Sequence, residues 1–257
     1  MLKCFDLTGE VAIVTGAAKG LGRVFAKALA KSGAHVYLLG HGEGGMKEVE
    51  KEIIELGVQC IWRYADITNQ KDVEESVSDC IKHFGKVDIL INNAAAPRIN
   101  LPPEVTALKQ WNQVIDTNVT GCFICSQAVG KEMIKRKKGK IVNLASISGF
   151  IINKGVHGGS YDVSKQAVVG LTRALAAEWA QYNINVNAIA PGYFLTDPNK
   201  KFFEKDAEFY KTALSMIPAQ RIGEPEELSG AVVFLSSSAS DYMHGSVLVI
   251  DGGYTIW

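Results

Sequence analysis

Seven short apolar runs alternate with longer helical segments, and this alternation constrains the fold more than any other feature of the chain. Several runs are apolar on both faces, as the strands of a buried parallel sheet are. The runs are Val11–Thr15, His35–Leu39, Cys60–Tyr64, Ile89–Asn92, Lys140–Leu144, Asn185–Ile189 and Val247–Ile250. We predict crossover helices over Leu21–Ser32, Lys47–Leu56, Lys71–Phe84, Lys109–Lys135, Tyr161–Tyr182 and Glu226–Leu235. The alternation predicts a doubly wound α/β fold, with a parallel sheet of about seven strands and helices on both faces.

Length and charge favour one domain, residues 1–257, because 257 residues of which 47% are hydrophobic can build one large core. Basic and acidic residues both number 27, so the formal net charge is zero. Nothing in this balance suggests a nucleic acid or a membrane surface as a partner. A near-neutral surface is compatible with self-association.

The N-terminus and the cysteines indicate a soluble protein of the reducing cytoplasm. No apolar segment follows Lys3 as in a signal peptide, and no apolar run is long enough to span a bilayer. The five cysteines show no metal-like clustering, so we expect no metal site. Cys122 and Cys125 form a C-x-x-C pattern inside a helical segment, where two buried side chains are expected rather than redox chemistry.

One segment, residues 196–223, interrupts the alternation. It is rich in Lys, Phe and Tyr and replaces a short connection. An insertion at the carboxyl edge of such a sheet usually covers a ligand. We therefore predict a substrate lid, in which Phe202, Phe203, Phe209 and Tyr210 either shelter an apolar ketone or form the small core of the lid itself.

A glycine-rich turn follows the first predicted strand in the sequence Thr15-Gly-Ala-Ala-Lys-Gly-Leu-Gly22. Gly16, Gly20 and Gly22 allow the main chain to approach a phosphate, while exposed amides and the helix N-terminus meet its charge. Lys19 and Leu21 belong to the same turn. The alternative is a glycine-rich turn without a ligand, but its place between a strand and a helix favours a dinucleotide site.

The end of the second predicted strand bears on the choice of dinucleotide. An NAD site usually holds an acidic residue here, whereas this chain has Gly40 and His41. Gly40 leaves room for a 2′-phosphate, whose charge Lys19 and His41 could balance, so NADP(H) is favoured and NAD(H) is the alternative. After the third strand, Asp66-Ile67 could accept a bond from an adenine amino group, or Asp66 could cap the next helix.

Further polar and small residues stand at or beside the carboxyl ends of predicted strands, where ligands bind in this architecture. Asn118 lies in a long helical segment, where an Asn is unfavourable by propensity and a buried hydrogen-bonding role is plausible. The remaining residues of this kind are Asn92, Asn93 and Ala94 after the fourth strand, Ser146 after the fifth, and Pro191, Gly192, Phe194 and Thr196 after the sixth.

Tyr161 and Lys165 stand at i and i+4 of a predicted helix, so their side chains share one face. An ammonium near a phenol favours the phenolate. We therefore expect Lys165 to lower the Tyr161 pKa from about 10 toward neutrality. A phenol tuned in this way can exchange a proton at physiological pH.

In this order, these motifs resemble the short-chain dehydrogenase/reductase family from about the first strand to the C-terminus. The resemblance implies a Rossmann-type fold and hydride transfer between a nicotinamide and a carbonyl or secondary alcohol. It assigns proton transfer to Tyr161, ribose binding and activation of that phenol to Lys165, substrate-oxygen binding to Ser146 and a water relay to Asn118. Cofactor binding falls to the glycine turn, to Asn93 and Ala94, and to the segment 191–196.

Two departures from the family pattern leave alternatives. The usual N-N-A-G reads N-N-A-A here, and the separation of Ser146 from Tyr161 is two residues longer than is common, so Ser148 is the second candidate serine. The longer spacing resembles polyol and ketose reductases, and the segment 185–196 resembles gluconate 5-dehydrogenases. Arg98, Lys154 and His157 could then contact a carboxylate or hydroxyls.

Two other functions and an assembly also follow from the sequence. A 3-oxoacyl thioester reductase is the alternative enzyme, although no strong basic patch for an acidic carrier stands out. A catalytically silent NADP(H)-binding sensor is the alternative class, disfavoured because Ser146, Tyr161 and Lys165 are all present. The resemblance also implies a homodimer or homotetramer packed through the helical segments Lys109–Lys135 and Tyr161–Tyr182.

Overall fold

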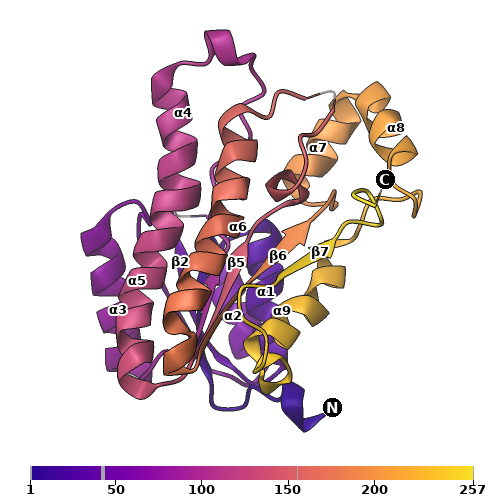
Figure 1. Ribbon diagram of the computed structural model, residues 1–257. Helices are drawn as coiled ribbons and strands as arrows, with labels where there is room; N and C mark the ends of the chain where they lie inside the picture. Colours follow the sequence, from indigo (N-terminus) through magenta and orange to yellow (C-terminus); the bar gives the residue numbers. More distant parts are fainter. Residues whose placement is uncertain (1, 42–43, 155, 257) are drawn as a thin grey trace.

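The computed structural model describes residues 2–41, 44–154 and 156–256, and its centre is one parallel sheet (Figure 1). The seven strands lie in the order β3-β2-β1-β4-β5-β6-β7. Their bounds are β1 Val11–Thr15, β2 His35–Gly40, β3 Cys60–Tyr64, β4 Ile89–Asn92, β5 Gly139–Leu144, β6 Ile184–Pro191 and β7 Val247–Ile250. The order reverses between β1 and β4, which is the position where ligands bind in doubly wound sheets. The predicted fold class is confirmed.

Helices cover both faces of the sheet because successive strand residues point to opposite sides. Ala12 and Val14 of β1 pack in the core on one face, while Val11 and Ile13 pack in the core on the other. The first core is closed by α1 (Gly20–Lys31), α2 (Met46–Ile54) and α9 (Ser229–Ser236). The second is closed by α3 (Gln70–Phe84), α5 (Cys122–Arg136) and α6 (Gly159–Trp179). Cys122 and Cys125 are both buried, as expected.

The helix expected over Lys109–Lys135 is present but contains a wider turn that was not expected. Its pieces are α4 (Leu108–Ile115), a π-helical turn (Asp116–Gly121) and α5. Apolar periodicity does not reveal one wider turn within a helix. Such π-turns occur frequently at functional sites, and this one contains Asn118.

The insertion forms two short helices beyond the carboxyl edge of the sheet, α7 (Asp197–Lys205) and α8 (Ala207–Ser215), at the upper right of Figure 1. Phe203 is buried in a separate small cluster there, with Phe209 and Tyr210 packed against it. The aromatic side chains of the insertion thus pack into a small core, except that Phe202 is exposed.

Candidate active site

The glycine turn between β1 and α1 lies against the end of β4. The Asn93 side chain donates to the carbonyls of Thr15 (2.9 Å) and Gly16 (3.1 Å), and the amides of Asn93 and Ala94 donate to the Thr15 hydroxyl. A Cβ on Gly16 would lie 2.8 Å from the Ala94 Cα, and one on Gly22 would overlap the Gly16 carbonyl. Only glycine fits at these two positions, and the resulting main-chain cradle suits a pyrophosphate.

The end of β2 has no acidic side chain. Gly40 is buried, with the flexible Met46 side chain as its nearest neighbour, while Lys19 and His41 are exposed. The His41 ring lies 5.1 Å from the Tyr64 ring, centroid to centroid.

At the next strand end, the Thr68 amide and hydroxyl both donate to Asp66 Oδ1. Asn69, not Asp66, caps α3. Ile67 is buried beside Gly121.

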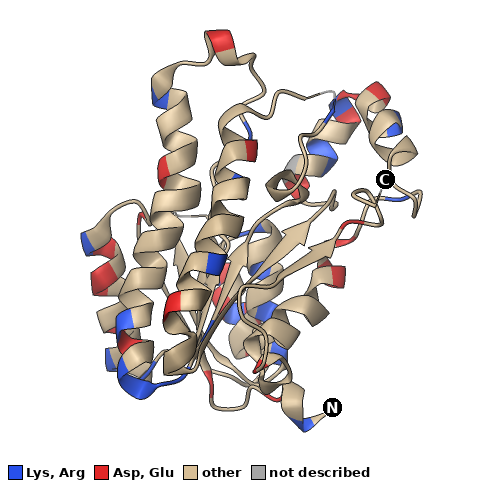
Figure 2. Ribbon diagram, viewed as in Figure 1, with Lys and Arg blue, Asp and Glu red and all other residues tan. Residues whose placement is uncertain are grey.

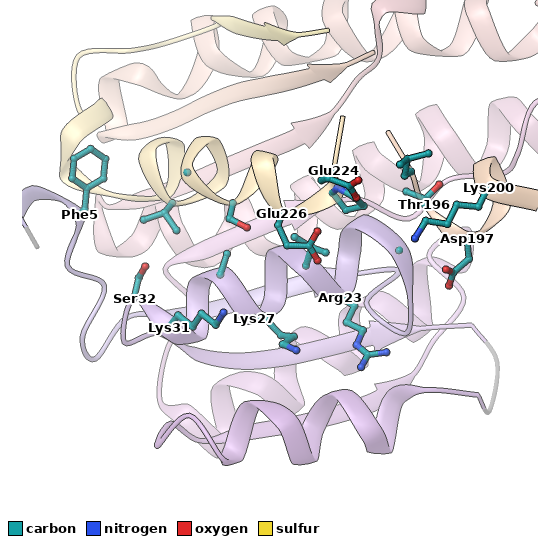
Figure 3. A pocket seen from close by; sticks show the side chains of 18 residues that line it. Phe5, Arg23, Lys27, Lys31, Ser32, Thr196, Asp197, Lys200, Glu224 and Glu226 are labelled. Carbon is teal, nitrogen blue, oxygen red and sulfur yellow. The ribbon is translucent and has the colours of Figure 1, made fainter. Parts of the chain in front are cut away.

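A cavity of about 740 Å³ lies between α1 and α9, and Figure 3 shows its lining side chains. Gly20 of the glycine turn and Thr196 at the start of the insertion line the same space. Arg23 and Lys27 come from α1, and both pair with Glu52. The cavity therefore brings together two predicted cofactor residues that are far apart in sequence, but Tyr161 is not among its lining residues.

The loop after β6 approaches the same edge of the sheet. A Cβ on Gly192 would lie 2.8 Å from the Asp251 Cα, so this position also requires close approach. The Phe194 side chain is 4% exposed and packs in the hydrophobic core. Its carbonyl accepts from the Thr196 amide and the Asn199 side chain. A cofactor contact by Phe194 would have to involve its main chain.

Tyr161 and Lys165 lie near the N-terminus of α6, with the phenol ring partly exposed and the lysine side chain buried. Lys165 Nζ donates to the Leu144 carbonyl at the end of β5 (2.7 Å) and lies 5.6 Å from the Tyr161 ring centroid. The helical spacing thus brings both residues to the carboxyl end of a central strand. This is the position that a dinucleotide-dependent active site requires.

The expectation that Lys165 lowers the Tyr161 pKa was wrong for this structure. Burial is the largest effect on the phenol and raises its pKa, while the Arg98 guanidinium and the nearby Ser146 hydroxyl act in the opposite direction. Burial also lowers the Lys165 pKa to about 8, because the charged ammonium loses hydration. Lys165 donates to the Leu144 carbonyl, and no hydrogen bond joins it to the phenol within the described residues, so burial outweighs the effect of its nearby charge.

The two candidate serines have different surroundings. Ser146 is partly exposed, its hydroxyl accepts from the Ser148 amide, and it is near enough to Tyr161 to lower the pKa of the phenol. Ser148 is 1% exposed, and its hydroxyl accepts from Arg98 and Asn153. Ser146 can reach a substrate oxygen beside the phenol, whereas Ser148 is held within the protein.

Asn118 connects three segments around the site. Its Oδ1 accepts from the Ala96 amide (2.7 Å), and its Nδ2 donates to the Ser164 hydroxyl (2.9 Å), which in turn donates to the Tyr161 carbonyl. Its side chain is therefore engaged in positioning α6. A water relay would have to use the main chain of the π-turn.

A polar cluster lies beside Tyr161, and of its members only Arg98 was expected near a substrate. Arg98 lies with its guanidinium carbon 4.7 Å from the phenol centroid and donates to Asp162. Asp162 follows the tyrosine directly, and Asn153 approaches from the loop before α6. An arginine after a strand end and an acidic residue in the first turn of a catalytic helix were visible signals, but their pairing depends on tertiary structure.

Comparisons with known proteins place this geometry in a family. A family profile described as enoyl-(acyl carrier protein) reductase matches residues 16–255. Gluconate 5-dehydrogenase of Gluconobacter oxydans is 38% identical over 98% of this chain and 97% of its own.

Solved structures of similar proteins agree with these sequence relationships. A short-chain type dehydrogenase/reductase from Mycobacterium marinum is 37% identical, with a TM-score of 0.93 over 99% of this chain and 98% of its own. A candidate 2-deoxy-D-gluconate 3-dehydrogenase from Agrobacterium tumefaciens, with bound NADP, is 38% identical, with a TM-score of 0.90 over 99% and 100%. Identity at this level over nearly the whole chain, together with the shared fold, shows that this protein belongs to the short-chain dehydrogenase/reductase family.

Proposed function

We propose that this oxidoreductase interconverts the carbonyl and secondary alcohol of a sugar acid, ketose or polyol with NADP(H). The observation that carries the proposal is the convergence of Tyr161, Lys165 and Ser146 at the end of β5, on the strand edge that also holds the glycine turn. A hydroxyl and a phenol side by side suit a carbonyl oxygen that gains and loses a proton.

Each catalytic side chain has a defined task in the proposal. Tyr161 gives a proton to the carbonyl oxygen during reduction and removes it during oxidation. Ser146 donates to the same oxygen and shares its developing charge. Lys165 holds the end of β5 through the Leu144 carbonyl and supplies a positive charge near the phenol. Asn118 fixes α6 against the loop that contains Ala96.

The residues at the strand ends fit a nicotinamide dinucleotide. Gly16 and Gly22 form a cradle that any Cβ would fill, and Gly40 leaves the ribose 2′ position without an opposing carboxylate. Lys19, exposed at the start of α1, is placed to meet a phosphate. The cofactor supplies the hydride, while the protein supplies placement and charge. NADP(H) is the favoured form.

The substrate class rests on the relatives and on Arg98. Two similar proteins are described by activities on gluconate or deoxygluconate. Arg98 places a guanidinium beside Tyr161, and a guanidinium is a good donor to carboxylates and hydroxyls. The lid, residues 196–223, is proposed to cover the substrate.

A 3-oxoacyl thioester substrate is less favoured by the charge distribution. The most basic run, residues 135–140, lies at the lower end of α5 in Figure 2, away from the carboxyl edge. Four of its cations pair with carboxylates: Lys135 with Glu132, Arg136 with Asp88, Lys138 with Glu10 and Lys140 with Asp241. This run therefore offers little unpaired positive charge to an acidic carrier protein.

Steady-state oxidation of NADPH tests these alternatives in one experiment. The panel comprises keto-sugars, 2- and 5-keto sugar acids and acetoacetyl thioesters, with NADPH affinity measured in parallel. We expect the highest kcat/KM for a keto-sugar acid or a ketose. Preference for the thioester would replace the proposed substrate class. Tight NADPH binding without turnover of any carbonyl would favour the silent sensor.

We also propose that the chain forms a homodimer or homotetramer through α4, α5 and α6. Large apolar side chains are exposed on these helices: Leu108, Trp111, Phe123 and Val163. Light scattering at micromolar concentration should show a mass at least twice that of one chain, and Phe123→Glu should reduce it. A monomeric wild-type protein would contradict this assembly.

None of the helices in the described part of the chain could span a membrane. Cys60, Cys80, Cys122 and Cys125 are buried free thiols. Because free thiols are typical of reducing compartments, we propose the cytoplasm as the location, which fractionation of the source cells would check.

A further inference from the structure

Tyr161 has a second cation beside it, in addition to Lys165. The Arg98 guanidinium carbon lies 4.7 Å from the phenol centroid, within the range of a cation–π contact. Arg98 comes from the loop after β4, and Tyr161 from the start of α6. The contact therefore depends on whatever holds the arginine across these two segments.

Asp162 and Ser148 hold the guanidinium in place. Arg98 Nη2 donates to Asp162 Oδ1 (2.7 Å) and to the Ser148 hydroxyl (2.9 Å), and Asn153 donates to the same hydroxyl (2.8 Å). The Asp162 side chain is only 2% exposed and that of Arg98 is 21% exposed. The pair is thus largely removed from water.

The loop before α6 closes over this pair through Gly158. A Cβ on Gly158 would overlap the Asp162 carboxylate and lie 3.2 Å from Arg98 Nη1. Asp162 Oδ2 and Arg98 Nη1 have no hydrogen-bond partner among the residues that the structure describes. A buried ion pair with unsatisfied atoms contributes little to stability, and neutral replacements are often tolerated. Its position beside the proposed proton-transfer residue points to function.

We propose that Asp162 and Arg98 are positioning residues for Tyr161: Asp162 holds the guanidinium against the phenol ring, where its positive charge favours the deprotonated phenol. This inference rests on the proposed role of Tyr161. The charged and titratable groups around the phenol come from two helices and two loops: Arg98, Cys122, Asp162, Lys165 and Tyr193. Arg98 lowers the Tyr161 pKa and Asp162 raises it, so the two residues have opposite direct effects.

The pH dependence of alcohol oxidation tests the role of Arg98, because oxidation needs the deprotonated phenol. Arg98→Met removes the charge but keeps much of the side-chain volume. We expect the rising limb of kcat/KM for the alcohol to move to higher pH by about one unit, which is a loss of about tenfold in rate on that limb. Arg98→Lys retains the charge and should restore part of the shift. An unchanged limb in Arg98→Met would overturn the inference.

Asp162→Asn distinguishes a holding role from a direct charge effect. If Asp162 acted only through its own negative charge, its removal would lower the Tyr161 pKa and move the limb to lower pH. If it holds Arg98, the limb moves to higher pH, as in Arg98→Met. We expect the second result. We also expect the double variant Arg98→Met/Asp162→Asn to shift no further than Arg98→Met alone, since both act through one contact. A shift to lower pH would refute the holding role.

Gly158→Ala provides an independent approach from the loop, because the added methyl group must displace the Asp162 carboxylate. Gly158→Ala should shift the rising limb of kcat/KM for the alcohol in the same direction as Asp162→Asn. It also tests the inference if Arg98→Met does not fold. NADPH affinity, measured by fluorescence titration, should stay within about twofold in all variants, since none of these residues lies at the glycine turn.

Tyr161→Phe distinguishes failure of this inference from failure of the proposed function. Full activity in Tyr161→Phe would contradict the proposed function itself. Loss of activity in Tyr161→Phe, together with wild-type pH profiles in Arg98→Met and Gly158→Ala, would overturn only the role of the Arg98–Asp162 pair.

Discussion

The two halves of the carboxyl edge of the sheet are built in different ways. The half formed by β1, β2 and β3 offers main-chain groups and space, through Gly16, Gly22 and Gly40. The half formed by β4, β5 and α6 offers charged and hydroxyl side chains, among them Ser146 and the buried Lys165. The first half is therefore sensitive to added volume, and the second to lost charge or hydrogen bonds.

The two halves also differ in how their buried groups affect the stability of the fold. In the glycine half, the Asn93 amide satisfies the turn carbonyls, and the described residues hold no ion pair across the turn. In the catalytic half, burial opposes the charged form of Lys165, and the Arg98–Asp162 pair is largely dehydrated. Groups arranged for catalysis commonly oppose stability. The following substitutions test this contrast, from the largest expected effect to the smallest.

Tyr161→Phe should have the largest effect because it removes the proton donor and little volume. We expect kcat to fall by about 10³-fold or more, since general acid–base catalysis is typically worth 10²–10⁴-fold. NADPH affinity should change little, because the phenol lies in the catalytic half. Stopped-flow turnover and fluorescence titration measure the two quantities. A parallel loss of binding would show that the two halves are not separable.

Ser146→Ala should lower kcat by about 10²-fold, the usual effect of removing one donor to a developing oxyanion. Ser148→Ala should have a smaller effect, since its hydroxyl accepts from Arg98 and Asn153. Comparison of kcat/KM for the two variants decides between the serines. The reverse order would assign the catalytic role to Ser148.

Gly22→Ala should damage the cofactor half by volume alone. The added methyl group would overlap the Gly16 carbonyl, and we expect NADPH affinity to fall by about 10–100-fold through displacement of the turn. Gly170→Ala in α6 is the matched control, because a Cβ there meets no atom within 4 Å. Equal NADPH dissociation constants for the two variants would mean that the cradle tolerates a side chain.

Lys165→Met should stabilise the folded protein. The Lys165 pKa falls from 10.5 to about 8 on burial, so between these values the folded state binds fewer protons than the unfolded state and stability rises with pH. Below about pH 8 the folded state bears the full free-energy cost of burying the charged ammonium. Removing the charge should raise the free energy of unfolding at pH 7 by about 1–3 kcal/mol, after loss of the bond to Leu144.

Denaturant unfolding of the wild type and of Lys165→Met across pH 7–10.5 measures the difference in their free energies of unfolding. This difference should shrink as the pH approaches 10.5. A less stable variant at pH 7 would show that the lysine supports the fold.

Gly40→Asp should have the smallest effect, a change of about tenfold in the NADPH/NADH preference. The new carboxylate would repel a 2′-phosphate and accept from a 2′-hydroxyl. Met46, the nearest neighbour of the added Cβ, is flexible enough to move. The ratio of kcat/KM for the two cofactors measures the change. An unaltered ratio would show that the end of β2 does not set cofactor choice.

What the sequence determined by itself is the part of the protein that rests on local pattern. Strand and helix periodicity predicted the seven strands, most of the helices and the glycine turn, and the i, i+4 spacing placed Tyr161 beside Lys165. These features depend on residues close together in the chain, where side-chain direction follows from secondary structure.

Only the tertiary structure decided how those residues are surrounded. It showed the π-turn at Asn118, the different environments of Ser146 and Ser148, and the contact of Arg98 with Tyr161. It also reversed the expected direction of the Tyr161 pKa. Burial and ion pairing depend on which distant segments meet, and the sequence pattern carries no measure of the hydration that a group loses when they do.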